Sequence, residues 1–234
     1  KNNFKFAENL YKEVLKIDSN NFEANFLLGT LFVQLRKYDD AQQLLQKAIK
    51  IQPRNVDAHY NIGNLLNELG KFHEAVKSYE KAIQIHPGHE GAHNNLGNIY
   101  KELGKFKDAI NCYEKAIKIN PDYVDAHNNL GTMFQKSKNF HEAINCYKKA
   151  VKLLPNFASA HNNLGLIFHE LEDYKKAIIS YKKAIQINPK YWEAYSSLGN
   201  VHKQLGEFDK AINCYENAIK YNPENLVYFF QLSE

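Results

Sequence analysis

The chain has 234 residues, of which 44% are hydrophobic and 24% charged, as in an ordinary globular protein. Its net charge of +4 comes from 30 Lys and Arg against 26 Asp and Glu, a balance too even to indicate a nucleic-acid partner. No apolar run approaches the roughly 20 residues of a membrane-spanning helix, so no membrane partner is expected either.

One pattern of 34 residues repeats along the chain from residue 22. The six prolines lie at this interval, at Pro53, Pro87, Pro121, Pro155, Pro189 and Pro223. A glycine column follows it too, at Gly29, Gly63, Gly97, Gly131, Gly165 and Gly199. Self-similarity at such a period is typical of a solenoid. The pattern predicts six repeats, 22–55, 56–89, 90–123, 124–157, 158–191 and 192–225. Residues 1–21 are expected to be the second half of a preceding repeat, and residues 226–234 the start of a further helix.

Each repeat is expected to contain two helices, which we name A and B. In repeat 90–123 the apolar residues recur at intervals of three and four, first over 92–103 and then over 106–117. Gly104 lies between the two stretches, where a turn is expected. The residue before Pro121 is pushed out of the helical conformation, which ends helix B. One helix pair buries too little surface to be stable alone, so the sequence predicts an all-α solenoid of stacked antiparallel helix pairs.

The small residues in fixed columns are expected to have a packing role. Glycine or alanine lets two helices approach more closely than usual. Large residues at the start of helix B are expected to fill the gap beside them. These are Tyr38, Phe72, Phe106, Phe140, Tyr174 and Phe208.

This arrangement resembles the tetratricopeptide repeat. The resemblance rests on the period, on Leu-Gly in helix A, on Tyr or Phe four residues after the first alanine of helix B, and on the closing proline, and it covers the whole chain. The family's common Trp early in helix A is missing. In its place stand Asn25, His59, His93, His127, His161 and Tyr195. The resemblance implies a right-handed superhelical array in which helix A lines a concave groove and helix B lies mostly outside.

Helix A carries asparagine on the face that the resemblance places in the groove. When each repeat is numbered from 1, with the helix A glycine at position 8, this polar face holds positions 5, 6 and 9. Position 6 holds Asn61, Asn95, Asn129 and Asn163. Position 5 holds Asn94, Asn128 and Asn162, and position 9 holds Asn64, Asn98 and Asn200. Asparagine forms helices less well than Glu or Lys, so a merely solvated face would not favour it.

The position 6 column resembles the asparagine ladder in the tetratricopeptide region of O-GlcNAc transferase, which clamps the backbone of substrate peptides. Leu27 and Ser197 interrupt the column in the outer repeats. Neighbouring helices pack roughly 10 Å apart and an extended peptide advances roughly 3.3 Å per residue, so each repeat would meet about every third peptide residue. A primary amide can pair with a peptide N–H and C=O together. The ten asparagines are therefore predicted to bind extended peptides; the alternative is that they only keep the surface solvated.

Histidine and cysteine columns are not expected to hold a metal or to form disulfides. Residues one repeat apart are too distant to share one zinc ion, whose ligands lie about 2 Å away, or to meet the roughly 7 Å Cα limit of a disulfide. The histidine column, His59, His93, His127 and His161, is expected to pack between helices. A weak metal site at the pair His86 and His89, or at the pair His89 and His93, is the alternative. Cys112, Cys146 and Cys214 are expected to be reduced thiols in the cytoplasm. No cofactor is expected.

An acidic partner is not expected in the groove. Some tetratricopeptide domains grip acidic chaperone tails with Lys or Arg at position 6, which holds no cation here. Position 2 instead holds Glu23, Asp57, Asp125 and Glu193, which would repel such a tail.

The sequence carries no catalytic motif, so the chain itself is not expected to be an enzyme. We expect an interaction scaffold that binds extended peptide or protein segments in its groove. The first alternative is the recognition arm of a larger enzyme, such as a glycosyltransferase, sulfotransferase or methyltransferase, because the chain begins at Lys1 without Met and ends within a helical pattern. The second is a structural solenoid that stacks end to end through uncapped terminal repeats. Its apolar end would include Tyr228, Phe229, Phe230 and Leu232.

Overall fold

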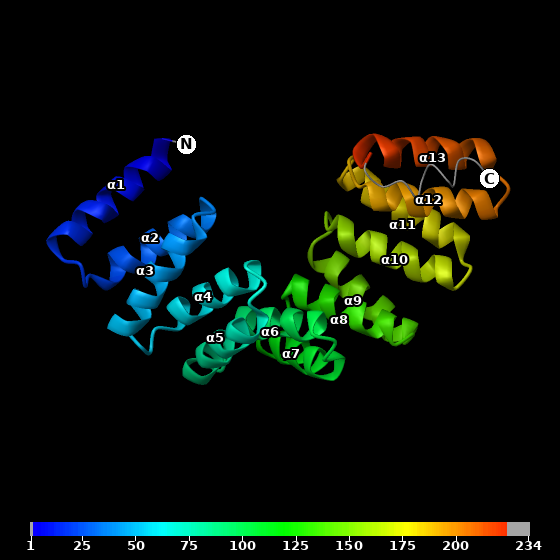
Figure 1. The fold of residues 1–234 in the computed structure, drawn as a ribbon. Coiled ribbons are helices and arrows are strands. Elements are labelled where there is room, and N and C mark those ends of the chain that lie inside the picture. Colours follow the sequence, from blue (N-terminus) through cyan, green and yellow to red (C-terminus); the bar gives the residue numbers. More distant parts are fainter. Residues whose placement is uncertain (1, 224–234) are drawn as a thin grey trace. The chain divides into compact units, whose positions relative to one another are not determined.

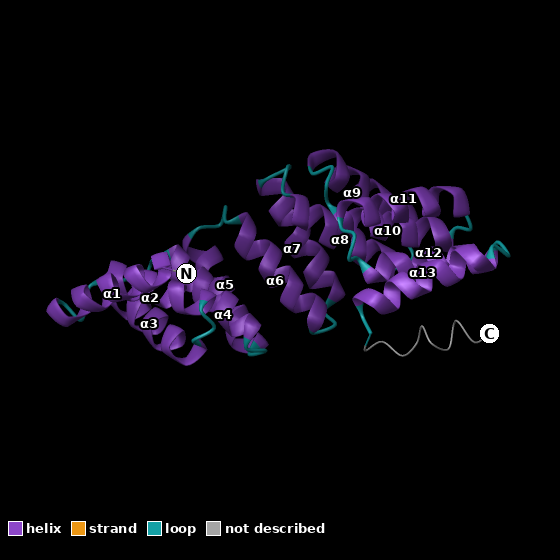
Figure 2. Ribbon diagram, turned by 90° about the horizontal axis from the view of Figure 1, so that it is seen from above, coloured by secondary structure: helices purple, strands orange, loops and turns teal. Residues whose placement is uncertain are grey.

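The computed structural model describes residues 2–223, and all regular structure in this range is α-helical (Figures 1 and 2). The first helix is α1 (Asn2–Ile17). The A helices are α2 (Phe22–Gln34), α4 (Val56–Glu68), α6 (Glu90–Glu102), α8 (Val124–Lys136), α10 (Ala158–Glu170) and α12 (Trp192–Gln204). The B helices are α3 (Tyr38–Ile51), α5 (Phe72–Ile85), α7 (Phe106–Ile119), α9 (Phe140–Leu153), α11 (Tyr174–Ile187) and α13 (Phe208–Tyr221). The predicted all-α solenoid of helix pairs is confirmed. The further helix predicted at 226–234 lies outside the described residues.

A residue with positive φ follows each A helix and turns the chain toward helix B. Glycine occupies this place in three repeats; Gly70, for example, has a φ of 70°. The N–H of Lys71 then donates to the Leu66 carbonyl at 2.8 Å and closes the end of α4. In the other three repeats the residues are Arg36, Lys138 and Glu172, with φ of 58°, 59° and 58°. A side chain in this conformation costs about 1–2 kcal/mol, so these three turns are strained.

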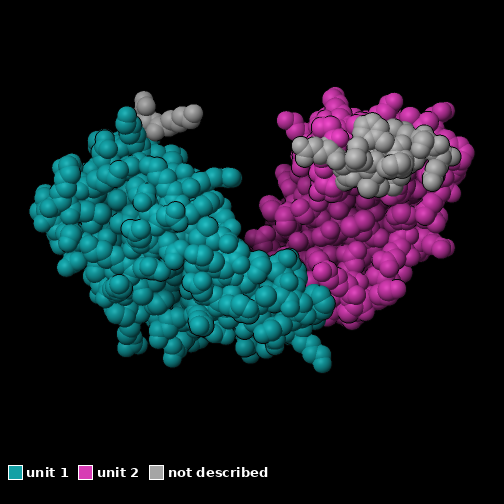
Figure 3. Space-filling view, viewed as in Figure 1, with its two compact units in different colours: residues 1–121 teal, residues 122–234 magenta. Residues whose placement is uncertain are grey.

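The chain forms two compact units, residues 1–121 and 122–234 (Figure 3). In the first unit, α2 contacts α4 and α4 contacts α6; in the second, α8 contacts α10 and α10 contacts α12. Each B helix contacts the A helix of its own repeat, and within a unit α3, α5, α9 and α11 also contact the next A helix. The described B helices of one unit make no comparable contact with one another. Because successive A helices approach each other and B helices do not, the A helices line the inner side of each unit.

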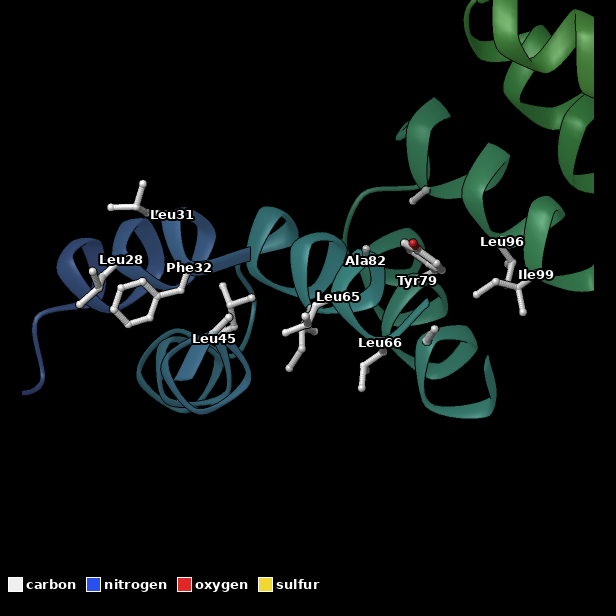
Figure 4. Packing of buried hydrophobic residues seen from close by; sticks show 14 of the residues in the cluster. Leu28, Leu31, Phe32, Leu45, Leu65, Leu66, Tyr79, Ala82, Leu96 and Ile99 are labelled. Atoms are coloured by element: carbon white, nitrogen blue, oxygen red, sulfur yellow. The ribbon is translucent and has the colours of Figure 1, made fainter. Parts of the chain in front are cut away.

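A tyrosine of helix B packs against the helix A glycine in five of the six repeats. Tyr79 is fully buried, and a Cβ added to Gly63 would lie 2.8 Å from its Cε1 atom. The same contact joins Gly97 to Tyr113, Gly131 to Tyr147, Gly165 to Tyr181 and Gly199 to Tyr215. Figure 4 shows Tyr79 among the leucines of the first unit's core. The glycine column therefore makes room for an aromatic ring.

The residues predicted to fill this gap do not fill it. Tyr38, Phe72, Phe140 and Tyr174 pack half-buried against the core but supply none of the atoms nearest the glycine, and Phe106 and Phe208 are 46% and 63% exposed. They stand at the first residue of helix B, at the edge of the contact with helix A, whereas the tyrosine lies two turns further along, facing the glycine. This part of the sequence prediction is wrong, and the tyrosine column takes the role.

Candidate functional site: the amide face of the A helices

The ten asparagines predicted to bind peptide all lie on A helices, and we call them the amide face. The first unit holds Asn61, Asn64, Asn94, Asn95 and Asn98. The second unit holds Asn128, Asn129, Asn162, Asn163 and Asn200. Their hydrogen bonds differ by position in the repeat, and this difference decides which amides are available to a ligand.

Position 9 serves the buried tyrosines. The Tyr79 hydroxyl donates to Asn64 Oδ1 at 2.7 Å. The equivalent bonds from Tyr113 to Asn98 and from Tyr215 to Asn200 are both 2.8 Å long. A buried hydroxyl needs such a partner, so the main role of these asparagines is to satisfy the hydroxyls of the core tyrosines. Burial also raises the pKa of Tyr79 well above its usual range.

The exceptions at position 9 support this role. Thr132 replaces asparagine in repeat 124–157, and its hydroxyl lies 3.1 Å from that of Tyr147. In repeat 158–191 the residue is Leu166, which offers no acceptor. The buried hydroxyl of Tyr181 consequently has no hydrogen-bond partner that meets normal geometry.

Position 6 asparagines tie α4 to α2, α6 to α4 and α10 to α8. Asn61 Nδ2 donates to Thr30 Oγ1 at 3.2 Å, and Asn163 Nδ2 donates to Asn128 Oδ1 at 3.1 Å. Asn95 Nδ2 donates twice, to Asn64 Oδ1 at 2.9 Å and to the Tyr60 hydroxyl at 3.1 Å. The asparagine column therefore stabilises the stacking of the repeats as well as facing their inner side.

The position 6 amides differ in their remaining capacity. A primary amide offers two N–H donors and one oxygen with two lone pairs. Asn95 uses both donors, and its oxygen accepts from Asn94 Nδ2 at 3.2 Å. Asn61 and Asn163 each use one donor only, and their oxygens accept no bond from the described residues. These two side chains, both partly exposed, can still offer a peptide one donor and one acceptor.

Position 5 differs from the expectation of a solvated or groove-facing residue. Asn94 and Asn162 are only 3% and 5% exposed. Position 5 faces the following A helix, since Tyr60 and Asn128 at this position accept bonds from position 6 of the next repeat. These side chains are covered by neighbouring structure rather than by water.

The histidine column closes the connection between repeats. The Nε2 of His59, His93 and His161 donates to the carbonyl of the proline six residues earlier, at 3.0 Å in each case. Asn25 has the same role in the first repeat and donates to Ser19 O at 3.0 Å. His89 Nδ1 accepts from the Ala92 N–H at 3.1 Å and caps α6. Within residues 2–223, no three His, Cys, Asp or Glu side chains gather as metal ligands.

Three clefts on the outer side were not expected from the sequence. They have volumes of 470, 360 and 430 Å³ and lie between α1 and α3, α5 and α7, and α11 and α13. Lysines line each of them, among them Lys12, Lys115 and Lys182. The buried thiol of Cys214 lines the third, and burial raises its pKa to about 11. The separation of B helices depends on the curvature of the stack, which the local pattern does not encode.

Family models match the chain from residue 26 to residue 225. A TPR repeat model matches residues 97–138, 133–172 and 165–206, and tetratricopeptide repeat models match 26–90, 78–111 and 192–225. The chain belongs to the tetratricopeptide repeat family. A tetratricopeptide array is an interaction scaffold, and its fold is typically non-catalytic.

This tetratricopeptide chain is similar to several solved structures. The structure of MamA is 27% identical, covers 70% of this chain and 95% of MamA, and has a TM-score of 0.62. YrrB, described as a TPR protein with an unusual peptide-binding site, is 22% identical over 81% of this chain and 98% of YrrB, with a TM-score of 0.63. The APC/C hetero-tetramer Cut9–Hcn1 gives a TM-score of 0.84 at 15% identity. The match covers 98% of this chain but only 45% of that one. A search of curated proteins found no match.

Membrane insertion and end-to-end stacking both depend on apolar surface. Among the described residues, no helix is both long and apolar enough to cross a bilayer. Helix α1 exposes Phe6, Leu10 and Ile17, at 72%, 52% and 89%. The apolar residues predicted for stacking at the other end, from Tyr228 to Leu232, lie outside the described residues.

Proposed function

We propose that the amide face of each unit binds extended peptide or protein segments through their backbone. The observation that carries this proposal is the spare hydrogen-bonding capacity of Asn61 and Asn163, on the inner side of their units. One N–H and one carbonyl oxygen on the same side chain match the C=O and N–H of an extended peptide. The description of YrrB as a peptide-binding TPR protein supports the proposal from a related fold.

This chemistry favours breadth over selectivity. Backbone groups are the same in every sequence, so amide contacts hold many segments with modest preference. The flanking repeats place Leu27 and Ser197 at position 6 and contribute less. Both N–H donors of Asn95 are already bonded, so Asn95 contributes by holding Asn64 and Tyr60 in place rather than by binding the peptide.

The test replaces the two available amides together, Asn61→Ser and Asn163→Ser. Serine is the native residue at this position in the last repeat, so the helices should remain intact. The matched control, Asn111→Ser with Asn145→Ser, changes two exposed asparagines on B helices. With arrayed peptides of random sequence and about nine residues, a length that spans neighbouring repeats, we expect affinity to fall about tenfold in the first variant only. Unchanged binding, or an equal loss in the control, would contradict the proposal.

We also infer a reducing, cytoplasmic location. Cys112, Cys146 and Cys214 form no disulfide within the described residues, and burial raises the pKa of Cys112 to about 11, which makes it unreactive. Titrating thiols in protein isolated from its native source without reductant should find all three free; an intermolecular disulfide would overturn the inference.

A further inference from the structure

The A helices of the first unit carry negative charge almost alone. Their carboxylates are Glu23, Asp57, Glu68, Glu90 and Glu102. Their single cation, Lys101, forms an ion pair with Glu102 at 3.3 Å. The B helices of the same unit carry lysine and carboxylate in near balance. The acidic character is therefore confined to the inner side of a chain whose net charge is +4.

Four of these carboxylates form two rows, one on each side of the amide column. Glu23 and Asp57 stand at position 2, and Glu68 and Glu102 stand at position 13. Position 2 lies four residues before position 6, and position 13 lies four residues after position 9, which is about 6 Å along the helix axis in each case. All four side chains are exposed, and Glu23 and Asp57 take part in no ion pair within the described residues.

Helix stability explains only one of the two rows. Position 2 is the second residue of helix A, where a carboxylate stabilises the helix N-terminus. Position 13 is the last residue of α4 and α6, where a carboxylate opposes the helix dipole. Glu68 accepts a hydrogen bond from the Tyr38 hydroxyl at 2.5 Å. Phe72 replaces that tyrosine in the next repeat, so Glu102 has no equivalent bond.

We infer that the amide face of the first unit takes a basic segment, with Lys or Arg at neighbouring positions. This rests on the proposed function. A peptide whose N–H and C=O point at Asn61 turns successive side chains in opposite directions along the A helices. Each side chain then reaches one of the two carboxylate rows. The side-chain amides hold the backbone of the segment, and the two carboxylate rows select the charge of its side chains.

The A helices of the second unit carry a weaker negative charge with which to select a basic segment. Lys136 occupies position 13 of α8, and Lys203 lies beside that position on α12. Asp125 and Glu193 remain at position 2, and Glu170 at position 13 of α10, so these A helices carry three carboxylates against two lysines. The preference for a basic segment is therefore a property of the first unit.

The experiment uses the full chain and three serine-based peptides of about nine residues, which carry Lys, Glu or Gln at the same places. The row carboxylates without an ion pair in the described residues are neutralised by Glu23→Gln, Asp57→Asn and Glu68→Gln together, while Glu102 keeps its ion pair with Lys101. The control variant, Asp39→Asn, Glu74→Gln and Glu114→Gln, makes the same change of charge on B helices of the same unit. Helix content by circular dichroism checks that both variants fold, and binding is measured by titration at low and high salt.

We expect the Lys peptide to bind about tenfold tighter than the Gln peptide, and the Glu peptide to bind more weakly than either. Neutralising the rows should abolish the Lys preference and its salt dependence while Gln-peptide binding persists; the control should change neither. Equal binding of Lys and Gln peptides overturns this inference and leaves the amide proposal standing. If all three peptides bind with the same affinity when Asn61 is changed to Ser, the amide proposal is overturned. If no peptide binds, both proposals are overturned.

Discussion

The second repeat (56–89) and the fifth repeat (158–191) share one packing scheme but differ in their polar detail. In both, a buried tyrosine fills the space left by a glycine. In the second repeat the Tyr79 hydroxyl donates to Asn64, whereas in the fifth the hydroxyl of Tyr181 lies near Ser197 but makes no hydrogen bond of normal geometry. The shared contact specifies the helix pair, and the hydrogen bond only adds stability to it.

The helix ends of the second repeat are also better stabilised than those of the fifth. Asn55 Oδ1 accepts from the Ala58 N–H at 2.9 Å and caps α4, whereas Phe157 gives α10 no side-chain cap. Gly70 makes the turn after α4 without strain, and Glu172 makes the equivalent turn with a φ of 58°. The fifth repeat should therefore open more readily than the second.

The largest effect should come from the contact that both repeats share. Gly63→Ala and Gly165→Ala place a methyl group 2.8 and 2.6 Å from the tyrosine Cε1, within a core that has no room for the ring to move. Overpacking outweighs the better helix propensity of alanine, so each change should cost about 1–2 kcal/mol in urea unfolding. Gly29→Ala meets a more yielding leucine at 3.0 Å and should be close to neutral. A neutral Gly63→Ala would show that the ring is not held.

Removing the hydroxyl should separate the two repeats. Tyr79→Phe loses a hydrogen bond and should destabilise α5 by about 1 kcal/mol. Tyr181→Phe removes a buried hydroxyl that makes no hydrogen bond of normal geometry, and should leave α11 as stable or more stable. Hydrogen exchange of amides in α5 and α11 measures each effect locally. Equal losses at the two sites would mean that Tyr181 has a partner in solution.

The helices and their pairing could be predicted because they follow from period and composition alone. Gly104 and Pro121 mark ends that any chain would respect. The tyrosine beside the glycine in five repeats was missed because Phe106 and Tyr113 are equally apolar in sequence, and only the start of α7 tells which of them faces α6.

The candidate site was predictable as a column but not as a set of bonds. The spacing places Asn61 and Asn95 in equivalent positions. Their hydrogen-bond partners are the residues at positions 9 and 5 of the preceding repeat. Asn64 and Tyr60 accept from Asn95, and Thr30 accepts from Asn61. Such pairing depends on how one helix stacks on another, which no single repeat contains.

Relieving the strained turn should bring the fifth repeat closer to the second. Glu172→Gly removes the cost of a positive φ but adds flexibility to the unfolded chain, so the net gain should be about 0.5 kcal/mol. The reverse change, Gly70→Glu, should cost a similar amount in the second repeat. Urea unfolding followed by hydrogen exchange at α10 and α11 would detect the gain. A loss of stability from Glu172→Gly would mean that the glutamate contributes contacts that outweigh the strain.

The smallest effect concerns pH and the connection before α6. Burial lowers the pKa of His93, and electrostatic interactions with Lys115 and His89 lower it further, while the hydrogen bond to the Pro87 carbonyl opposes the shift. The folded state therefore binds the proton less readily than the unfolded state, so stability is complete above the unfolded pKa of about 6.5 and falls as pH drops below it. His93→Asn should flatten this dependence between about pH 7.5 and pH 5.5, because Asn25 shows that asparagine can donate to the carbonyl six residues earlier. Unfolding midpoints of the two proteins across this range give the comparison. An unchanged slope would place the dependence on another group.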